Sequence, residues 1–176
     1  MNRRLLMTCV CVVLAVATVG RAESLRIVPL VHDDQVLVTV ELSDAYNNGV
    51  REAIASGLRT TFSYEIELRM IVPTWVDRTI ASEVVTISDQ YDNLTRRHSL
   101  SRTIDGRVDD SLVTDDENIV KQWLTKLNRL PLCRTSKLDA TRDYYVRIRA
   151  RSKPQGGSLL SLATTITGQA KFTFIP

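Results

Sequence analysis

Three arginines recur at every second residue in the stretch "DYYVRIRARSKP", close to the C-terminal end of the chain. Alternate residues of a β-strand point to the same face, so a strand here stacks Arg147, Arg149 and Arg151 into a ladder of cations. One interpretation is a surface that binds an anion or an acidic partner. The other is a solvated sheet face, in which the arginines pair with acids of the neighbouring strand. We favour the second interpretation and keep the three arginines as candidate binding residues.

A histidine lies among a second group of cations, in "TRRHSLSR". On a strand His98 shares a face with Arg96, and neighbouring cations favour a neutral imidazole, which suits a general base. The surrounding sequence identifies no nucleophile and no acid that would orient the ring, so we interpret His98 as a surface or interface histidine. We therefore predict Arg96, Arg97 and His98 as further binding residues and predict no catalytic residue.

The remaining candidates for chemistry have simpler explanations. His32, Asp33 and Asp34 offer three metal ligands, but aspartate is common in turns and the trio is better interpreted as one. Cys133 is the only cysteine outside the N-terminal segment, and a single thiol forms neither an internal disulfide nor a thiolate metal site. The chain has no phosphate-loop lysine motif, no His-Glu-x-x-His and no Gly-x-Ser-x-Gly. We predict neither a metal nor a cofactor.

The N-terminal segment indicates export. Arg3 and Arg4 precede an apolar run of about sixteen residues, and the following "GRA" suits cleavage after Ala22. A retained membrane anchor is the alternative, because the run is only slightly shorter than the roughly 17–25 residues of a spanning helix. We predict a signal peptide over 1–22 and a single β-rich domain over 23–176.

The charge balance changes once the signal peptide is removed. The whole chain has 23 Lys+Arg and 20 Asp+Glu, and its formal net charge is +3. Arg3, Arg4 and Arg21 belong to the predicted signal peptide, which contains no acid, so the mature chain is formally neutral. Net charge therefore gives no argument for a nucleic-acid partner or for an anionic membrane.

The hydrophobic pattern predicts mostly strands. Apolar and polar residues alternate strictly over 62–72, and a second apolar face recurs over 36–42. Pro29 lacks a ladder donor and predicts an edge strand, while Asp105-Gly106 predicts a hairpin turn. In 143–151, Tyr144, Val146, Ile148 and Ala150 form the predicted buried face, and the arginines lie outward.

Two helices interrupt the strands. The first is predicted over 47–57, with Gly57 as its end. The second is predicted to start with Thr114 as its N-cap and to end at Pro131, with an apolar stripe that includes Leu127. "SKPQGGS" (152–158) predicts a long loop before a last strand over 170–176. The order predicts an α+β fold, mainly an antiparallel β-sheet or β-sandwich with two packed helices.

Several of these segments together resemble a known family. The chain has a helix that ends in Ser-Gly, a long strand with Glu-Leu-Arg, a Trp-x-Asp segment and a Tyr-Asp-x-Leu-Thr stretch. These are Ser56-Gly57, Glu67-Leu68-Arg69, Trp75-Val76-Asp77 and Tyr91-Asp92-Asn93-Leu94-Thr95. The pattern resembles an exported bacterial family, domain of unknown function 4390. The resemblance implies export and a β-rich fold, and it supplies no catalytic residue.

Three classes of function follow. We predict an exported, non-enzymatic accessory protein of the periplasm or envelope, which contacts another envelope protein through a sheet edge or the arginine face and binds no nucleic acid. Membrane contact is expected only if the N-terminal segment is kept as an anchor. The alternatives are a small-ligand-binding module, with walls from Trp75, Tyr144 and Tyr145, and an envelope hydrolase. A deep pocket with two converging carboxylates or with His98 would favour an enzyme. An apolar cavity between the sheet and the helices would favour a ligand-binding module, and a flat basic face without a cavity would favour an adaptor.

Overall fold

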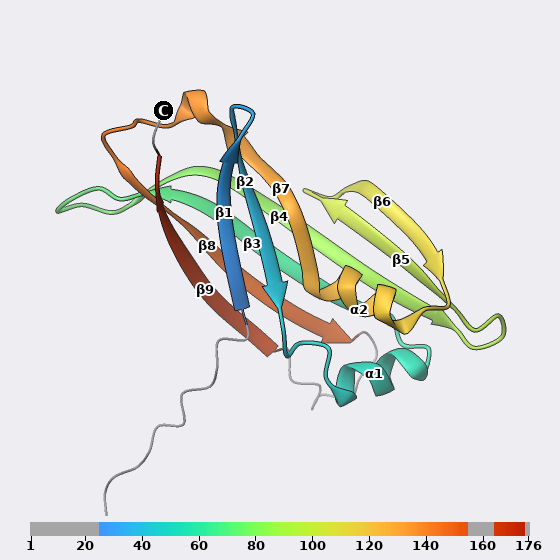
Figure 1. Cartoon of the computed structure of the whole chain (residues 1–176). Helices are drawn as coiled ribbons and strands as arrows, with labels where there is room; N and C mark the ends of the chain where they lie inside the picture. Colours follow the sequence, from blue (N-terminus) through green and yellow to red (C-terminus); the bar gives the residue numbers. More distant parts are fainter. Residues whose placement is uncertain (1–24, 155–163, 175–176) are drawn as a thin grey trace, which may run out of the picture.

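The computed structural model describes residues 25–154 and 164–174. Over these residues the chain forms two antiparallel sheets that pack against each other, with helices at one end (Figure 1). The elements are β1 (Leu25–His32), β2 (Gln35–Leu42), α1 (Asn48–Ala55), β3 (Thr60–Met70), β4 (Arg78–Asp92), β5 (Arg97–Ile104), β6 (Arg107–Thr114), α2 (Glu117–Thr125), β7 (Lys126–Arg134), β8 (Asp143–Pro154) and β9 (Thr164–Thr173). The prediction of an α+β fold with two packed helices is confirmed. The predicted signal peptide, 1–22, and the loop residues 155–158 lie outside the described residues.

The smaller sheet has the order β1-β2-β7 and the larger one has the order β6-β5-β4-β3-β8-β9. Within the part of the chain that the structure describes, β1 pairs with β2 alone, so Pro29 does lie on an edge strand. The hairpin between β5 and β6 turns at Asp105 and Gly106, whose φ angles of 48° and 79° suit the predicted two-residue turn. β9 begins at Thr164, six residues before the predicted start of the last strand.

The core lies between the two sheets and is formed by the predicted alternating faces. The inward residues of β2, β3 and β8 are almost completely buried, and they are Val36, Val38, Val40, Leu42, Phe62, Tyr64, Ile66, Leu68, Tyr144, Val146, Ile148 and Ala150. Burial of one large apolar side chain contributes about 1.5–3 kcal/mol. Because period-two burial is repeated on several strands, their outward faces are fixed as well.

The predicted start and end of the second helix are wrong. The N-cap is Asp116, whose Oδ1 accepts a hydrogen bond from Asn118 N at 2.8 Å, while the Thr114 hydroxyl accepts one from Asp116 N at 3.1 Å. The helix ends at Thr125, and the chain continues directly into β7 with Pro131 inside that strand.

Pairing with β2 explains why the helix ends so early. Leu127, Leu130 and Leu132 are buried on the small sheet, and their burial outweighs the helical spacing of the preceding apolar residues. β7 tolerates Pro131 because it is bulged and pairs only with β2 among the described strands.

The molecule has two distinct ends (Figure 1). α1, the start of α2 and the β4–β5 turn lie at one, which we call the helix end. The β3–β4 loop (71–77) and the β7–β8 connection (135–142) lie at the other, which we call the loop end. No helix among the described residues is long and apolar enough to cross a membrane.

Candidate functional site

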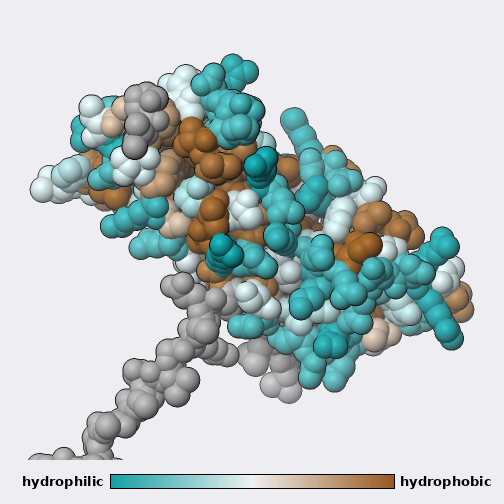
Figure 2. All heavy atoms as spheres, viewed as in Figure 1, coloured by the Kyte–Doolittle hydropathy of each residue, from teal (hydrophilic) through white to brown (hydrophobic). Residues whose placement is uncertain are grey.

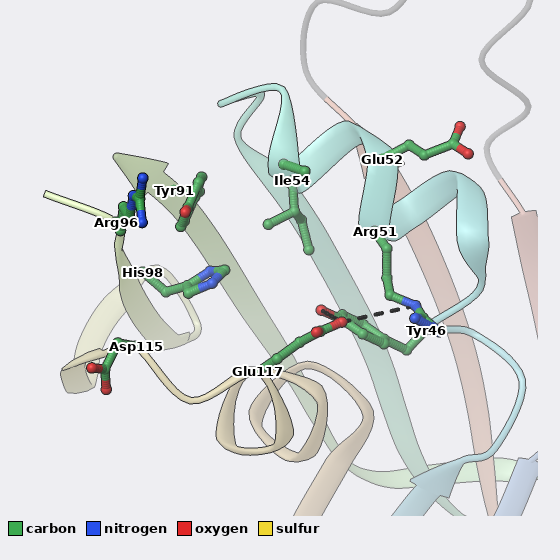
Figure 3. Close-up of a pocket in the computed structure, with 10 residues that line it drawn as sticks. Tyr46, Arg51, Glu52, Ile54, Tyr91, Arg96, His98, Asp115 and Glu117 are labelled. Atoms are coloured by element: carbon green, nitrogen blue, oxygen red, sulfur yellow. Dashed lines mark hydrogen bonds and ion pairs between the residues drawn. The ribbon is translucent and has the colours of Figure 1, made fainter. Parts of the chain in front are cut away.

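A pocket of about 480 Å³ opens at the helix end. It lies between α1, the β4–β5 turn and the start of α2, and Figure 3 shows the side chains that line it. His98, Tyr91 and Ile54 form its inner part, and charged residues surround the opening. The volume is in the range typical of small-ligand sites.

The strand register places an acid beside His98. Asp89 on β4 lies opposite Leu100 of β5, and His98 precedes Leu100 by two residues, so the two side chains are diagonal neighbours on the inner sheet face. His98 Nδ1 lies 2.9 Å from Asp89 Oδ2, Asp89 is fully buried and His98 is 8% exposed. The interpretation of His98 as a surface histidine without an orienting acid is therefore wrong.

Burial dominates the electrostatics of this pair. Removal from water raises the pKa of Asp89, and the contact with His98 opposes that shift only in part. Asp89 Oδ1 has no hydrogen-bond partner among the described residues. The ring of Tyr91 lies opposite His98 in the ladder, with the ring centroids 4.6 Å apart, so the imidazole is held between the carboxyl group and an aromatic wall.

The far side of the opening is a small polar network. Glu117 Oε1 accepts a hydrogen bond from the Tyr46 hydroxyl at 3.4 Å and lies 3.8 Å from Arg51 Nε. Burial and the neighbouring Glu117 carboxylate raise the pKa of Tyr46 to about 12, so its hydroxyl stays a neutral donor. This network closes one side of the pocket between α1 and α2 (Figure 3).

Three charged residues at the pocket are not paired in this way. Arg96, Glu52 and Asp115 have no ion pair within the described ranges, 25–154 and 164–174. Figure 3 shows Arg96 and Asp115 on the side away from Arg51. Figure 3 shows the Glu52 carboxylate pointing away from the other lining side chains, so a ligand would meet one unpaired cation, Arg96, and one unpaired carboxylate, Asp115.

The predicted binding residues separate into two places. Arg96 and His98 line the helix-end pocket, whereas Arg97 is exposed and its side chain is on the opposite face of β5 from His98. The β8 arginines lie on the outer face of the large sheet, because the inner face of β8 is buried in the core.

Each β8 arginine is close to an acid of β3, which confirms the expected cross-strand pairing. Arg147 Nη2 lies 2.5 Å from Glu67 Oε2, and Arg149 Nη1 lies 2.8 Å from Glu65 Oε2. Arg151 Nη1 lies 3.5 Å from Glu65 Oε1. We call Glu65, Glu67 and these three arginines the β3–β8 ladder. Whether it binds anything stays a prediction.

Other predicted candidates remain apart from the helix-end pocket. Asp33 and Asp34 form a turn with positive φ angles, and the contact of Asp33 with His32 is exposed. Of the predicted wall residues, Tyr144 is buried in the core and Trp75 is 81% exposed. Within the described residues no group of three or more metal-ligating side chains converges.

The sequence carried one overlooked signal of the site. Val85, Ile87, Asp89 and Tyr91 alternate on the inner face of β4, so an acid stands where the pattern predicts an apolar residue. A buried acid at such a position needs a hydrogen-bond partner, and His98 on the next strand can supply it.

The comparisons with known proteins agree with the resemblance noted in the sequence. No curated protein and no solved structure matches the chain. Residues 20–156 match the model of the family described as Domain of unknown function (DUF4390). Since this match covers most of the chain, the protein belongs to the DUF4390 family.

Proposed function

We propose that this protein is an exported binding protein of the bacterial envelope, and that the helix-end pocket holds a small zwitterionic ligand such as a short peptide. The observation that carries the proposal is His98, which is buried in the pocket wall and held by Asp89 at 2.9 Å. With Nδ1 engaged by a carboxyl group, the other ring nitrogen is the one left to a ligand.

The charges around the opening support a ligand that carries both signs. Arg96 is available to a carboxylate, while Asp115 is available to an ammonium group. A purely anionic ligand would meet the Asp115 carboxylate as well as Arg96. The aromatic walls, Tyr46 and Tyr91, favour a cationic amine as well.

The predicted route through protein contacts has weaker support. The β8 arginines are close to Glu65 and Glu67, so an acidic partner would have to displace those carboxylates. A strand added to β6 would meet Asp109 and Asp110 at a bulge, a feature that discourages edge pairing. The pocket offers a site without such competition.

The test uses leucylleucine, its C-terminal amide and its N-acetyl derivative, which remove one ligand charge at a time. Isothermal titration calorimetry should give the tightest binding for leucylleucine, and each derivative should bind about tenfold more weakly or worse. Arg96→Gln should abolish the preference for the free carboxylate, and the matched Arg97→Gln variant should keep it. Equal effects of the two substitutions, or no binding by leucylleucine, would contradict the proposal.

A second function, hydrolysis, is favoured by the same Asp89–His98 contact. A carboxylate that holds Nδ1–H leaves Nε2 as a proton acceptor, which is the arrangement of a general base. The pocket lining includes no Ser, Thr or Cys among the described residues, so His98 would activate water. Release of leucine from leucylleucine, reduced on the order of 10²–10⁴-fold by Asp89→Asn, would support this function. Binding without release would leave the protein a binding protein.

A further inference from the structure

A groove of about 490 Å³ at the loop end is lined by three cations and one acid. It is lined by Arg78 from the start of β4 and by Lys137 and Arg142 from the β7–β8 connection. Throughout the described part of the chain, none of the three lies within ion-pair distance of an acid. The groove therefore has a local surplus of positive charge in a chain that is neutral after its predicted cleavage.

The one acid in this groove is already engaged. Asp139 Oδ1 accepts hydrogen bonds from the Thr141 amide at 2.9 Å and from the Thr141 hydroxyl at 2.7 Å. These bonds hold the pKa of Asp139 below its usual value and keep the carboxylate turned to its own loop. The charge of Arg142 lowers the pKa of Asp139 as well, so three cations face a single, already engaged acid, and the groove offers an outside anion a net positive charge.

The loop that leads into Arg78 presents apolar side chains to solvent. Trp75 is 81% exposed and Val76 is 73% exposed at the tip of the β3–β4 loop. In Figure 1 this loop projects beyond the body of the sheets, on the same side as the β7–β8 connection. A protruding tryptophan next to a surplus of positive charge suits a contact surface.

Hydrogen bonds of Asp77 join the two ends of this loop and attach it to the sheet. Its Oδ2 accepts a hydrogen bond from the Tyr145 hydroxyl at 2.8 Å, and its Oδ1 accepts one from Val72 N at 3.2 Å. Arg69 Nη2 donates to the Asp77 carbonyl oxygen at 2.8 Å. Trp75 therefore projects from a loop whose base is hydrogen-bonded on both sides, which reduces the conformational entropy that the loop backbone would lose on binding.

We propose that the loop end is a docking surface for a bilayer that contains anionic phospholipid. Tryptophan prefers the interface between headgroups and acyl chains, and Arg78, Lys137 and Arg142 lie where lipid phosphates would be. A protein partner fits less well, since one protruding Trp and one Val supply far less area than the roughly 800 Å² per side of a stable interface. A bilayer is deformable, so it can bury a protruding side chain without the preformed pocket that a protein partner would need.

This docking goes beyond the proposed function and does not depend on it. It places the opposite end of the molecule, with its pocket, away from the bilayer. It also differs from anchoring by the N-terminal segment, because it predicts that Trp75 itself enters the lipid.

The test measures Trp75 fluorescence in the full chain. Trp123→Phe removes the only other tryptophan, so the emission then reports Trp75 alone. Vesicles of phosphatidylcholine and phosphatidylglycerol with brominated acyl chains should quench the emission and shift it to the blue. Vesicles of phosphatidylcholine alone should do so much less. Soluble glycerol phosphate should cause no shift, which separates a lipid surface from a free phosphate ester.

Charge variants complete the test. Arg78→Gln/Lys137→Gln/Arg142→Gln should weaken partition of Trp75 into the anionic vesicles on the order of 100-fold. The matched control is Arg97→Gln/Arg107→Gln/Lys121→Gln, which removes the same charge from other exposed positions and should leave partition within about threefold of wild type. No quenching in anionic vesicles, or equal losses in the two triple variants, would overturn the docking surface. Since the readout is quenching by the lipid itself, attachment through the N-terminal segment alone gives no signal.

Discussion

Two polar cross-strand contacts on the same six-stranded sheet differ in almost every physical respect. The Asp89–His98 pair lies on the inner face, is nearly inaccessible to water and joins diagonal neighbours of β4 and β5. The β3–β8 ladder lies on the outer face and joins residues directly opposite each other, such as Glu67 and Arg147. The side chains of the ladder remain between 29% and 50% exposed.

The difference shows which contact requires an explanation beyond folding. Half-exposed ion pairs contribute about 0–1 kcal/mol each and occur on many sheet surfaces. A buried acid must be stripped of water, and its partner seldom compensates in full, as the raised pKa of Asp89 indicates. An apolar pair at positions 89 and 98 would be expected to fold at least as well, so the polar pair is better explained by the pocket that His98 lines.

Removal of His98 should have the largest effect on stability. His98→Ala leaves Asp89 buried without its hydrogen-bond partner, and we expect the free energy of unfolding to fall by about 3 kcal/mol. His32→Ala is the matched control, because His32 also contacts an aspartate, at 3.2 Å, but in an exposed turn. Its effect should stay within about 0.5 kcal/mol.

Urea denaturation of the two variants measures both values. Losses of equal size would mean that burial does not distinguish the two histidine contacts, and the comparison between inner and outer pairs would fail.

The sequence predicted the ladder because its signal is local. Period-two alternation on β3 and β8 identifies which residues point outward, and the complementary signs of Glu65, Glu67 and the arginines suggest that the strands are neighbours. The same alternation identified the buried faces of the core strands. Such features can be predicted from the residue pattern of each strand and from the pairing of one strand with its neighbour.

The helix-end site depends on information that no single segment contains. Asp89 meets His98 only because the turn between β4 and β5 sets the register, and Arg96 in that turn adopts a φ of 56°. The pocket also needs α2 to begin at Glu117 with Asp116 as its N-cap, whereas the sequence prediction placed the N-cap two residues earlier, at Thr114. The early end of α2 also depends on tertiary pairing. Leu127 fits the apolar stripe of a helix as well as a strand, and pairing with β2 makes it part of β7.

The pH dependence of stability should have opposite signs for the fully buried Asp89 and the half-buried, hydrogen-bonded Asp77. Burial raises the pKa of Asp89 above its ordinary 3.8, so ionisation costs stability, which is lost as pH rises from 3.8 through the folded-state pKa. Hydrogen bonds from Tyr145 and Val72 lower the pKa of Asp77, so its stabilisation is present above 3.8 and is lost as pH falls through the folded-state pKa.

Asp89→Asn and Asp77→Asn isolate these two contributions. With increasing pH, the stability of the wild type relative to Asp89→Asn should fall, and its stability relative to Asp77→Asn should rise. Thermal unfolding between about pH 3 and pH 7 measures both differences. Slopes of the same sign would show that Asp89 is not governed by its burial.

The smallest effect belongs to the ladder. Glu67→Gln keeps the shape of the side chain and removes the charge that faces Arg147, and we expect a loss below about 1 kcal/mol. The loss should shrink further in 1 M salt, where screening acts over only about 3 Å. A double-mutant cycle with Arg147→Gln, measured by urea denaturation at low and high salt, isolates the pair from the changes that each substitution brings alone. A coupling energy above about 2 kcal/mol that does not change with salt would mean that the ladder is desolvated in the same way as the Asp89–His98 pair. The outer face of the sheet would then require a functional explanation as well.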